Sequence, residues 1–154
     1  MQYLVVFLIS MVPVIELRGA IPYGLGFGLD PILTYALAIV GNCIPVPFIL
    51  FFIKRILLWM QTSRFALFRK VSAFLTEKAQ KNFHKVQKYA VFGLYLFVAI
   101  PLPGTGAWTG GLIAALLDMK KRYALLSIFL GVLTAGVIMW LITGGVLAGL
   151  SFLL

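Results

Sequence analysis

The chain has 154 residues, of which 62% are hydrophobic and only 11% are charged, and its formal net charge is +9. These proportions lie outside the range of soluble folds and predict a single all-α integral membrane domain. Nine of the thirteen basic residues lie between Lys54 and Lys88, so the charge indicates anionic lipid headgroups as partners and excludes nucleic acid. A lone cysteine, Cys43, rules out an intrachain disulfide and a thiolate metal cluster, and no cofactor or metal is expected.

Residues 1–30 predict a re-entrant helical hairpin. An apolar stretch of about 12 residues reaches Pro13, and the segment PVIELRGAIP then occupies residues 13–22 before YGLGFG. Apolar pieces of 10–14 residues are too short to cross a bilayer but suit a segment that enters and leaves on one face. Residues 31–53 are long enough to span. Within them GNCIPVP (41–47) predicts a kink, with Asn42 as a cavity residue at the depth of the hairpin tip.

Residues 54–89 form a basic middle segment in which apolar positions recur at roughly helical spacing. This pattern is typical of an amphipathic helix or helix pair that lies at the membrane interface. Orientation and anchoring of the domain are the simplest role for it, and lipid sensing is the alternative.

The second half of the chain repeats the plan of the first. Residues 90–118 predict a second re-entrant hairpin whose tip is PLPGTGAWTGG (101–111), and residues 123–150 predict a second span. Basic residues follow the first span and precede the second at 120–122, so the positive-inside rule places 54–89 and 119–122 in the cytoplasm and both termini outside. The hairpins then open to opposite faces, which makes the halves an inverted repeat. A rival interpretation stretches 1–29 and 90–117 into full spans, giving four in total.

Glu16 and Arg18 are charges inside the first predicted tip, where an isolated charge costs roughly 2.5–3.5 kcal/mol. Residues two apart do not face each other on an α-helix, so either the tip is unwound or the two side chains have different partners. Gly19, Pro13 and Pro22 favour the unwound tip. One hypothesis is that Arg18 binds an anion and Glu16 provides a coupled proton or cation position. The other is a structural salt bridge that closes the hairpin.

The second tip has no charge but is rich in residues that permit close approach of a ligand or of the opposing hairpin. A half-helix that begins after Pro103 would direct its first amides at an anion. Tight packing through small residues is the alternative. The candidate residues at this tip are Pro101, Pro103, Gly104, Thr105, Gly106 and Trp108.

The segments MVPVIELRGAIP, GNCIPVP and PLPGTGAWTGG, in this order, resemble the bacterial and archaeal family of small multidrug export proteins over nearly the whole chain. That family resembles a branch of the DedA superfamily, which implies two oppositely entering re-entrant hairpins, lipid translocation and proton dependence. Glu16 matches the acidic position of the first DedA hairpin in kind. The second hairpin departs from the arginine motif of that superfamily, because Ala99 stands where the first arginine falls and no arginine follows Pro103.

The leading functional hypothesis is therefore a transporter or lipid translocase of the prokaryotic cytoplasmic membrane. It would move a small amphipathic or anionic substrate, such as a polyprenyl phosphate, past the facing tips with proton coupling through Glu16. The alternatives are an exporter of cationic drugs and a scaffold that transports nothing. We do not expect an enzyme, since the only histidine, His84, lies in the basic segment. A homodimer is expected, because two hairpins and two spans shield the polar tips only thinly.

Overall fold

The computed structural model describes residues 1–62, 70, 73, 89–102 and 104–153. This described part is helical and contains no strand. Its labelled helices are α1 (Gln2–Met11), α2 (Glu16–Gly26), α3 (Pro31–Cys43), α4 (Pro45–Thr62), α6 (Ala90–Ala99), α7 (Ala107–Leu116) and α8 (Lys121–Leu153). The predicted all-α class is confirmed. Most of the predicted amphipathic segment lies outside the described residues.

Helices α1 and α2 form an antiparallel hairpin. The first helix ends at Met11, and its C-cap Val12 has the extended backbone (φ −73°, ψ 129°) that a residue before proline prefers. Val14 then takes a left-handed φ of 77°, and α2 begins at Glu16. The unwound tip is thus shorter than the sequence suggested. Pro22 lies inside α2, where it deprives only the Arg18 carbonyl of a helical donor.

Helices α3 and α4 form one long rod that is interrupted at Ile44. Asp30 caps α3 by accepting a hydrogen bond from the Leu33 amide at 2.8 Å, and Pro31 occupies the first helical position. Pro45 and Pro47 cannot donate to the carbonyls four residues earlier, which accounts for the break predicted near this point. No glycine or proline follows before Thr62, so α4 continues past the expected end at residue 53.

Helices α6 and α7 form a second antiparallel hairpin, which leads into α8. Helix α6 ends at Ala99, its C-cap Ile100 is extended, and Gly104 turns the chain with a φ of 84°. Two helices pass the length and hydropathy criteria for a membrane span, Pro31–Ile53 and Lys121–Val146. They coincide closely with the two spans that the sequence predicted.

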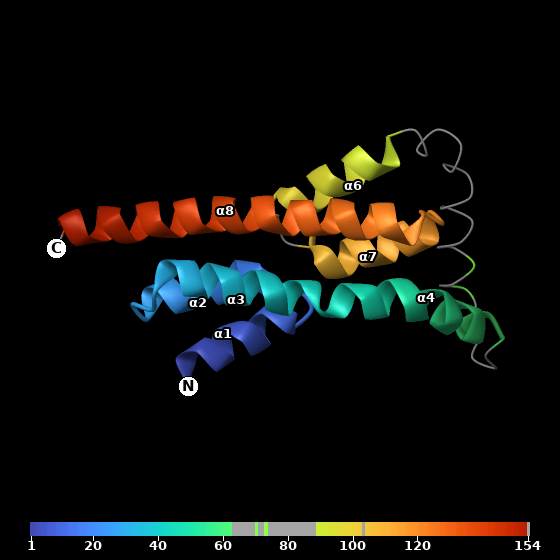
Figure 1. Ribbon diagram of the computed structural model, residues 1–154, viewed down its shortest axis with the longest axis horizontal. Coiled ribbons are helices and arrows are strands. Elements are labelled where there is room, and N and C mark those ends of the chain that lie inside the picture. The colour runs from blue at the N-terminus through green and yellow to red at the C-terminus, as the bar shows by residue number, and fades with distance from the viewer. Residues whose placement is uncertain (63–69, 71–72, 74–88, 103, 154) are drawn as a thin grey trace.

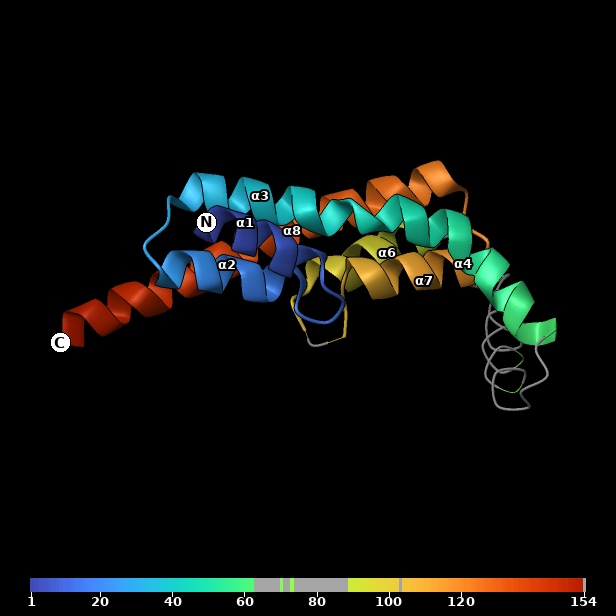
Figure 2. The same cartoon turned by 90° about the horizontal axis from the view of Figure 1, so that it is seen from below.

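The two hairpins point at each other from opposite ends of the molecule (Figures 1 and 2). The α3–α4 rod and α8 run antiparallel along the long axis, with α1–α2 packed at one end against α3 and α8. The α6–α7 hairpin packs at the other end against α8 and α4. Fully buried alanines at the helix crossings, including Ala20, Ala38, Ala107 and Ala114, let the helix backbones approach closely. The tips consequently meet near the middle of the molecule.

Candidate functional site at the hairpin tips

Glu16 of the first hairpin caps a helix of the second. The residue is only 3% exposed, and its Oε1 accepts a hydrogen bond from the Trp108 backbone amide at 3.2 Å. Trp108 is the second residue of α7, whose N-cap Gly106 has no side chain to satisfy the free amides of the first turn. The expected anion at this helix N-terminus is therefore the chain's own carboxylate.

Gly106 is needed at the tip because of space. Its backbone is extended (φ −143°, ψ −170°), a conformation open to any residue, so backbone freedom is not the reason for a glycine. A Cβ atom added at this position would collide with the Glu16 carboxylate. The absence of a side chain thus allows the carboxylate to reach the end of α7.

Arg18 joins the same two tips through different atoms. Its Nη1 lies 3.9 Å from Glu16 Oε2, while Nη2 donates to Thr105 Oγ1 at 3.1 Å and to the Ile100 carbonyl at 3.3 Å. The Thr105 hydroxyl lies 2.7 Å from the same Ile100 carbonyl and holds the turn together. The spacing of Glu16 and Arg18 predicted either an unwound tip or different partners for the two side chains. The structure shows both: Glu16 has a left-handed φ of 51°, and each charge has its own partner on the second tip.

The Trp108 indole provides a further bond between the tips. Its Nε1 donates to the carbonyl of Met11, the last residue of α1, at 3.1 Å. Trp108 thus binds the first hairpin on both sides of its unwound segment, through its backbone to Glu16 and through its ring to Met11. We call the bonded set Glu16, Arg18, Thr105 and Trp108 the tip junction.

The remaining predicted residues are placed as follows. Gly19 packs against the Ile15 side chain, where a Cβ would clash. Pro101 is half-buried in the second tip loop, Gly104 has open space around it, and Pro103 lies outside the described residues. Asn42 is fully buried, and neither atom of its amide finds a hydrogen-bond partner in the described structure. The structure therefore does not join Asn42 to the tip junction.

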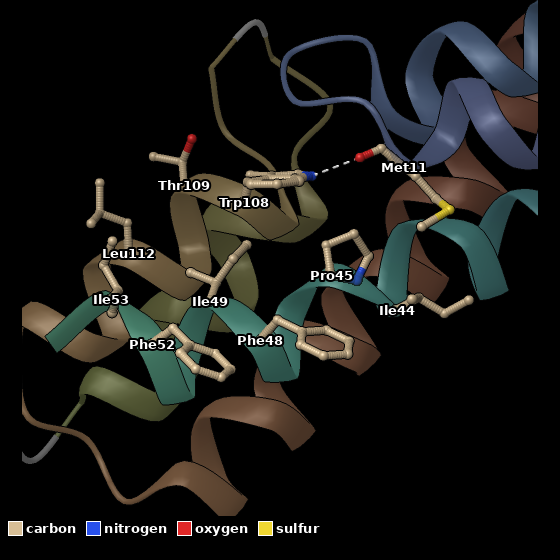
Figure 3. Close-up of a pocket in the computed structure, with 10 residues that line it drawn as sticks. All are labelled: Met11, Ile44, Pro45, Phe48, Ile49, Phe52, Ile53, Trp108, Thr109 and Leu112. Carbon is tan, nitrogen blue, oxygen red and sulfur yellow. Dashed lines mark hydrogen bonds between the residues drawn. The ribbon is translucent and has the colours of Figure 1, made fainter. Parts of the chain in front are cut away.

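An apolar pocket of about 650 Å³ adjoins the tip junction (Figure 3). The Trp108 ring forms one part of its wall, and α4 supplies another just beyond the break at Ile44. Its lining residues are Met11, Ile44, Pro45, Phe48, Ile49, Phe52, Ile53, Trp108, Thr109 and Leu112. Of these, only Trp108 was a candidate site residue from the sequence; Thr109 lies in the same predicted tip, and most of the others belong to apolar runs. The prolines of GNCIPVP were the one available signal.

A second apolar pocket of about 500 Å³ lies between the start of α4 and the start of α8. Its wall contains Cys43, Val46, Pro47, Leu125, Leu126, Ile128 and Phe129, and it also contains the cation Arg122. The two pockets thus have similar size and apolar character but different charged neighbours: Glu16 is bonded to the lining residue Trp108 of the first, and Arg122 lines the second.

No group of three or more metal-ligating side chains occurs among the described residues. Two long apolar helices, packed with two short hairpins around a buried polar junction, are features of a helical membrane protein. The chain belongs to the family described as "putative small multi-drug export protein", whose family model matches residues 16–138. No curated protein and no solved structure gives a match to this chain. The matched range begins at Glu16, after the unwound segment of the first tip, and includes the whole second tip.

Proposed function

We propose that the protein is a membrane transporter that exports small amphipathic molecules, and that its two hairpins are re-entrant. Helices α1, α6 and α7 have 10 residues each and α2 has 11, so each is about 15 Å long. That is roughly half of a 30 Å hydrocarbon core, whereas the two candidate spans of 23 and 26 residues are long enough to cross it. The hairpin tips then meet near the bilayer midplane.

The basic residues support an inverted arrangement of the two halves. Lys54 and Arg55 lie in α4, and Lys121 and Arg122 open α8, at the same end of the molecule in Figure 1. Lys121 Nζ lies 3.9 Å from the ring centre of Phe51, which ties the two basic segments together. The positive-inside rule makes this end cytoplasmic. The α1–α2 hairpin then enters from outside and the α6–α7 hairpin from the cytoplasm, as in inverted-repeat transporters.

The tip junction is the observation that carries the transport proposal. Four hydrogen bonds join the hairpins: Glu16 to Trp108, Trp108 to Met11, and Arg18 to Thr105 and to Ile100. Each contributes about 0.5–3 kcal/mol net, so separating the tips costs a few kcal/mol, which a substrate or a proton can offset. A substrate passes when the tips part, and Glu16 is the acidic group to which proton movement is coupled.

Drug-like cargo suits this site better than a lipid phosphate. The family name refers to multidrug export, and the pocket beside the junction is apolar. Arg18 is the only arginine at the tips, and its Nη2 already serves Thr105 and Ile100. A DedA-like translocase of anionic lipids would require Arg18 to release these partners, and we keep it as the alternative for the experiment below.

The test is flux in proteoliposomes under an imposed pH gradient, with a cationic dye in one set and a polyprenyl phosphate in the other. Wild type is compared with Glu16→Gln and Arg18→Gln. Asp30→Asn is the matched control, because it also neutralises a carboxylate but keeps a cap for α3 far from the tips. All variants are first shown to be folded by thermal unfolding.

We expect wild type and Asp30→Asn to transport the dye when the pH gradient is imposed. Glu16→Gln should lose at least nine-tenths of this dye flux. Transport of the lipid with loss in Arg18→Gln favours the translocase. If wild type moves neither cargo and the tip variants lose only thermal stability, the transport proposal is wrong. The tip junction is then structural and the protein is a membrane scaffold.

A further inference from the structure

The apolar pocket beside Trp108 has the size and the wall of a small-molecule site. Its volume of about 650 Å³ falls within the range of 300–1,000 Å³ that is usual for such sites. Phe48 and Phe52 on α4 and the Trp108 indole on α7 present aromatic surface to it (Figure 3). Phe48 is 62% exposed and Phe52 is 53% exposed, so the pocket is reached from the side, where lipid lies in the proposed orientation.

A carboxylate is bonded to one residue of this pocket wall. None of the ten lining residues is charged. The ring of Trp108 forms part of the wall, and the backbone amide of the same residue donates a hydrogen bond to the Glu16 carboxylate at 3.2 Å. Arg18 Nη1 lies 3.9 Å from Glu16 Oε2 and partly offsets this charge. The hydrogen bonds of Arg18 go to Ile100 and Thr105, and none of these residues lines the pocket. An anion behind aromatic walls in an apolar setting attracts an organic cation.

We propose that this pocket is the binding site for a lipophilic organic cation, held between Phe48, Phe52 and Trp108 and attracted by Glu16. The assignment rests on the proposed transport function and adds to it a substrate class and an entry point. Because Trp108 is both pocket wall and tip-junction residue, a bound cation contacts the group that joins the two hairpins. The second pocket, with Arg122 in its wall, disfavours the same ligand.

The probes are tetraphenylphosphonium and tetraphenylborate, which have nearly the same shape and opposite charge. Binding to the full chain in nanodiscs is measured by equilibrium dialysis, with binding to empty nanodiscs subtracted. We expect saturable binding of tetraphenylphosphonium, about one per chain, and at least tenfold weaker binding of tetraphenylborate to the same site.

The variants locate the site. Phe48→Leu combined with Phe52→Leu keeps an apolar wall but removes two rings, and affinity for tetraphenylphosphonium should fall about five- to thirtyfold. Phe129→Leu removes a half-exposed ring from the second pocket and should change affinity less than twofold. Glu16→Gln keeps the acceptor for the Trp108 amide but removes the charge. Glu16→Gln should lower the affinity for tetraphenylphosphonium and reduce the difference in affinity between tetraphenylphosphonium and tetraphenylborate.

A second measurement reports on the wall itself. In a variant with Trp59→Phe and Trp140→Phe, Trp108 is the only tryptophan, and tetraphenylphosphonium should change its fluorescence with the same midpoint as in dialysis. Absence of saturable phosphonium binding, equal or tighter binding of tetraphenylborate, or an equal effect of Phe129→Leu would overturn the site. If the probe binds as expected while wild type moves no cargo in proteoliposomes, the site stands and the transport function is the part that fails.

Discussion

Replacement of Gly106 by alanine tests the contact on which the tip junction depends. The extended backbone at this position accepts alanine without strain, so any loss of stability comes from the added methyl group. That methyl collides with the buried Glu16 carboxylate. We expect the carboxylate to move away from α7 and to lose its hydrogen bond to the Trp108 amide.

The size of the effect follows from that bond. A hydrogen bond to a charged, buried group contributes about 1.5–3 kcal/mol, and the first turn of α7 loses its cap as well. Gly106→Ala should therefore lower the free energy of unfolding by about 2–3 kcal/mol. At about 2–4 °C per kcal/mol for a chain of this length, the Tm should fall by roughly 4–12 °C. Gly93→Ala, in the open middle of α6, should instead raise stability by about 0.5–1 kcal/mol.

The assay is thermal unfolding in a mild detergent, arranged as a double-mutant cycle with Glu16→Ala. If the methyl acts by displacing the carboxylate, Gly106→Ala should cost almost nothing once that carboxylate is absent. The interaction term between the two sites should then be about 2 kcal/mol. An equal cost of Gly106→Ala in both backgrounds would refute the reasoning, because the methyl would then clash with something other than Glu16.

Three other substitutions test the packing of α3 and the hydrogen bonding of the junction. Gly41→Ala should lower the Tm by more than Gly93→Ala raises it, because its Cβ would lie 2.6 Å from the Phe7 carbonyl oxygen, a backbone atom that moves little; an unchanged Tm would contradict this packing. Asn42→Leu should stabilise the protein by about 1–3 kcal/mol, since it removes a fully buried amide without partners; destabilisation would mean that the amide is satisfied in the membrane. Trp108→Phe keeps an aromatic ring but loses the indole N–H that donates to the Met11 carbonyl, so the free energy of unfolding should fall by about 1 kcal/mol. An unchanged free energy of unfolding would mean that this hydrogen bond is absent in solution.

The sequence predicted the parts of this fold that are marked by rare residues. Pro13 and the prolines of the second tip mark chain breaks within apolar runs, so both hairpins were recognisable, as was the interruption near Pro45. Glu16 and Arg18 stood out because charges are costly in an apolar chain. Their partners were not predictable, because three of the four cross-tip bonds involve backbone groups, which carry no signal in the residue letters.

The pocket was invisible in the sequence for a related reason. In a soluble helix, polarity separates the buried face from the exposed face, but in this chain apolar residues face the core, the pocket and the outer surface alike. Phe48 and Phe51 illustrate the difficulty: both are exposed, yet only Phe48 lines the pocket, while Phe51 packs under Lys121. Only the crossing of α7 over α4 decides which phenylalanine belongs to the pocket.

The bonds at the tip junction explain why two hairpins occur together. The Met11 carbonyl, the Ile100 carbonyl and the Trp108 amide all lie at helix ends, where backbone groups lack partners within their own helix. Each is satisfied by a group of the opposite hairpin: the first by the indole of Trp108, the second by Arg18 and the third by Glu16. Without the opposite hairpin, the Met11 carbonyl and the Trp108 amide would lose these partners in hydrocarbon, at a cost of several kcal/mol each. The Ile100 carbonyl would keep the Thr105 hydroxyl and the Leu102 amide of its own hairpin. If the tips separate as the proposed transport function requires, water or a substrate has to replace these partners, so opening of the junction and hydration of a path between the hairpins would be one event.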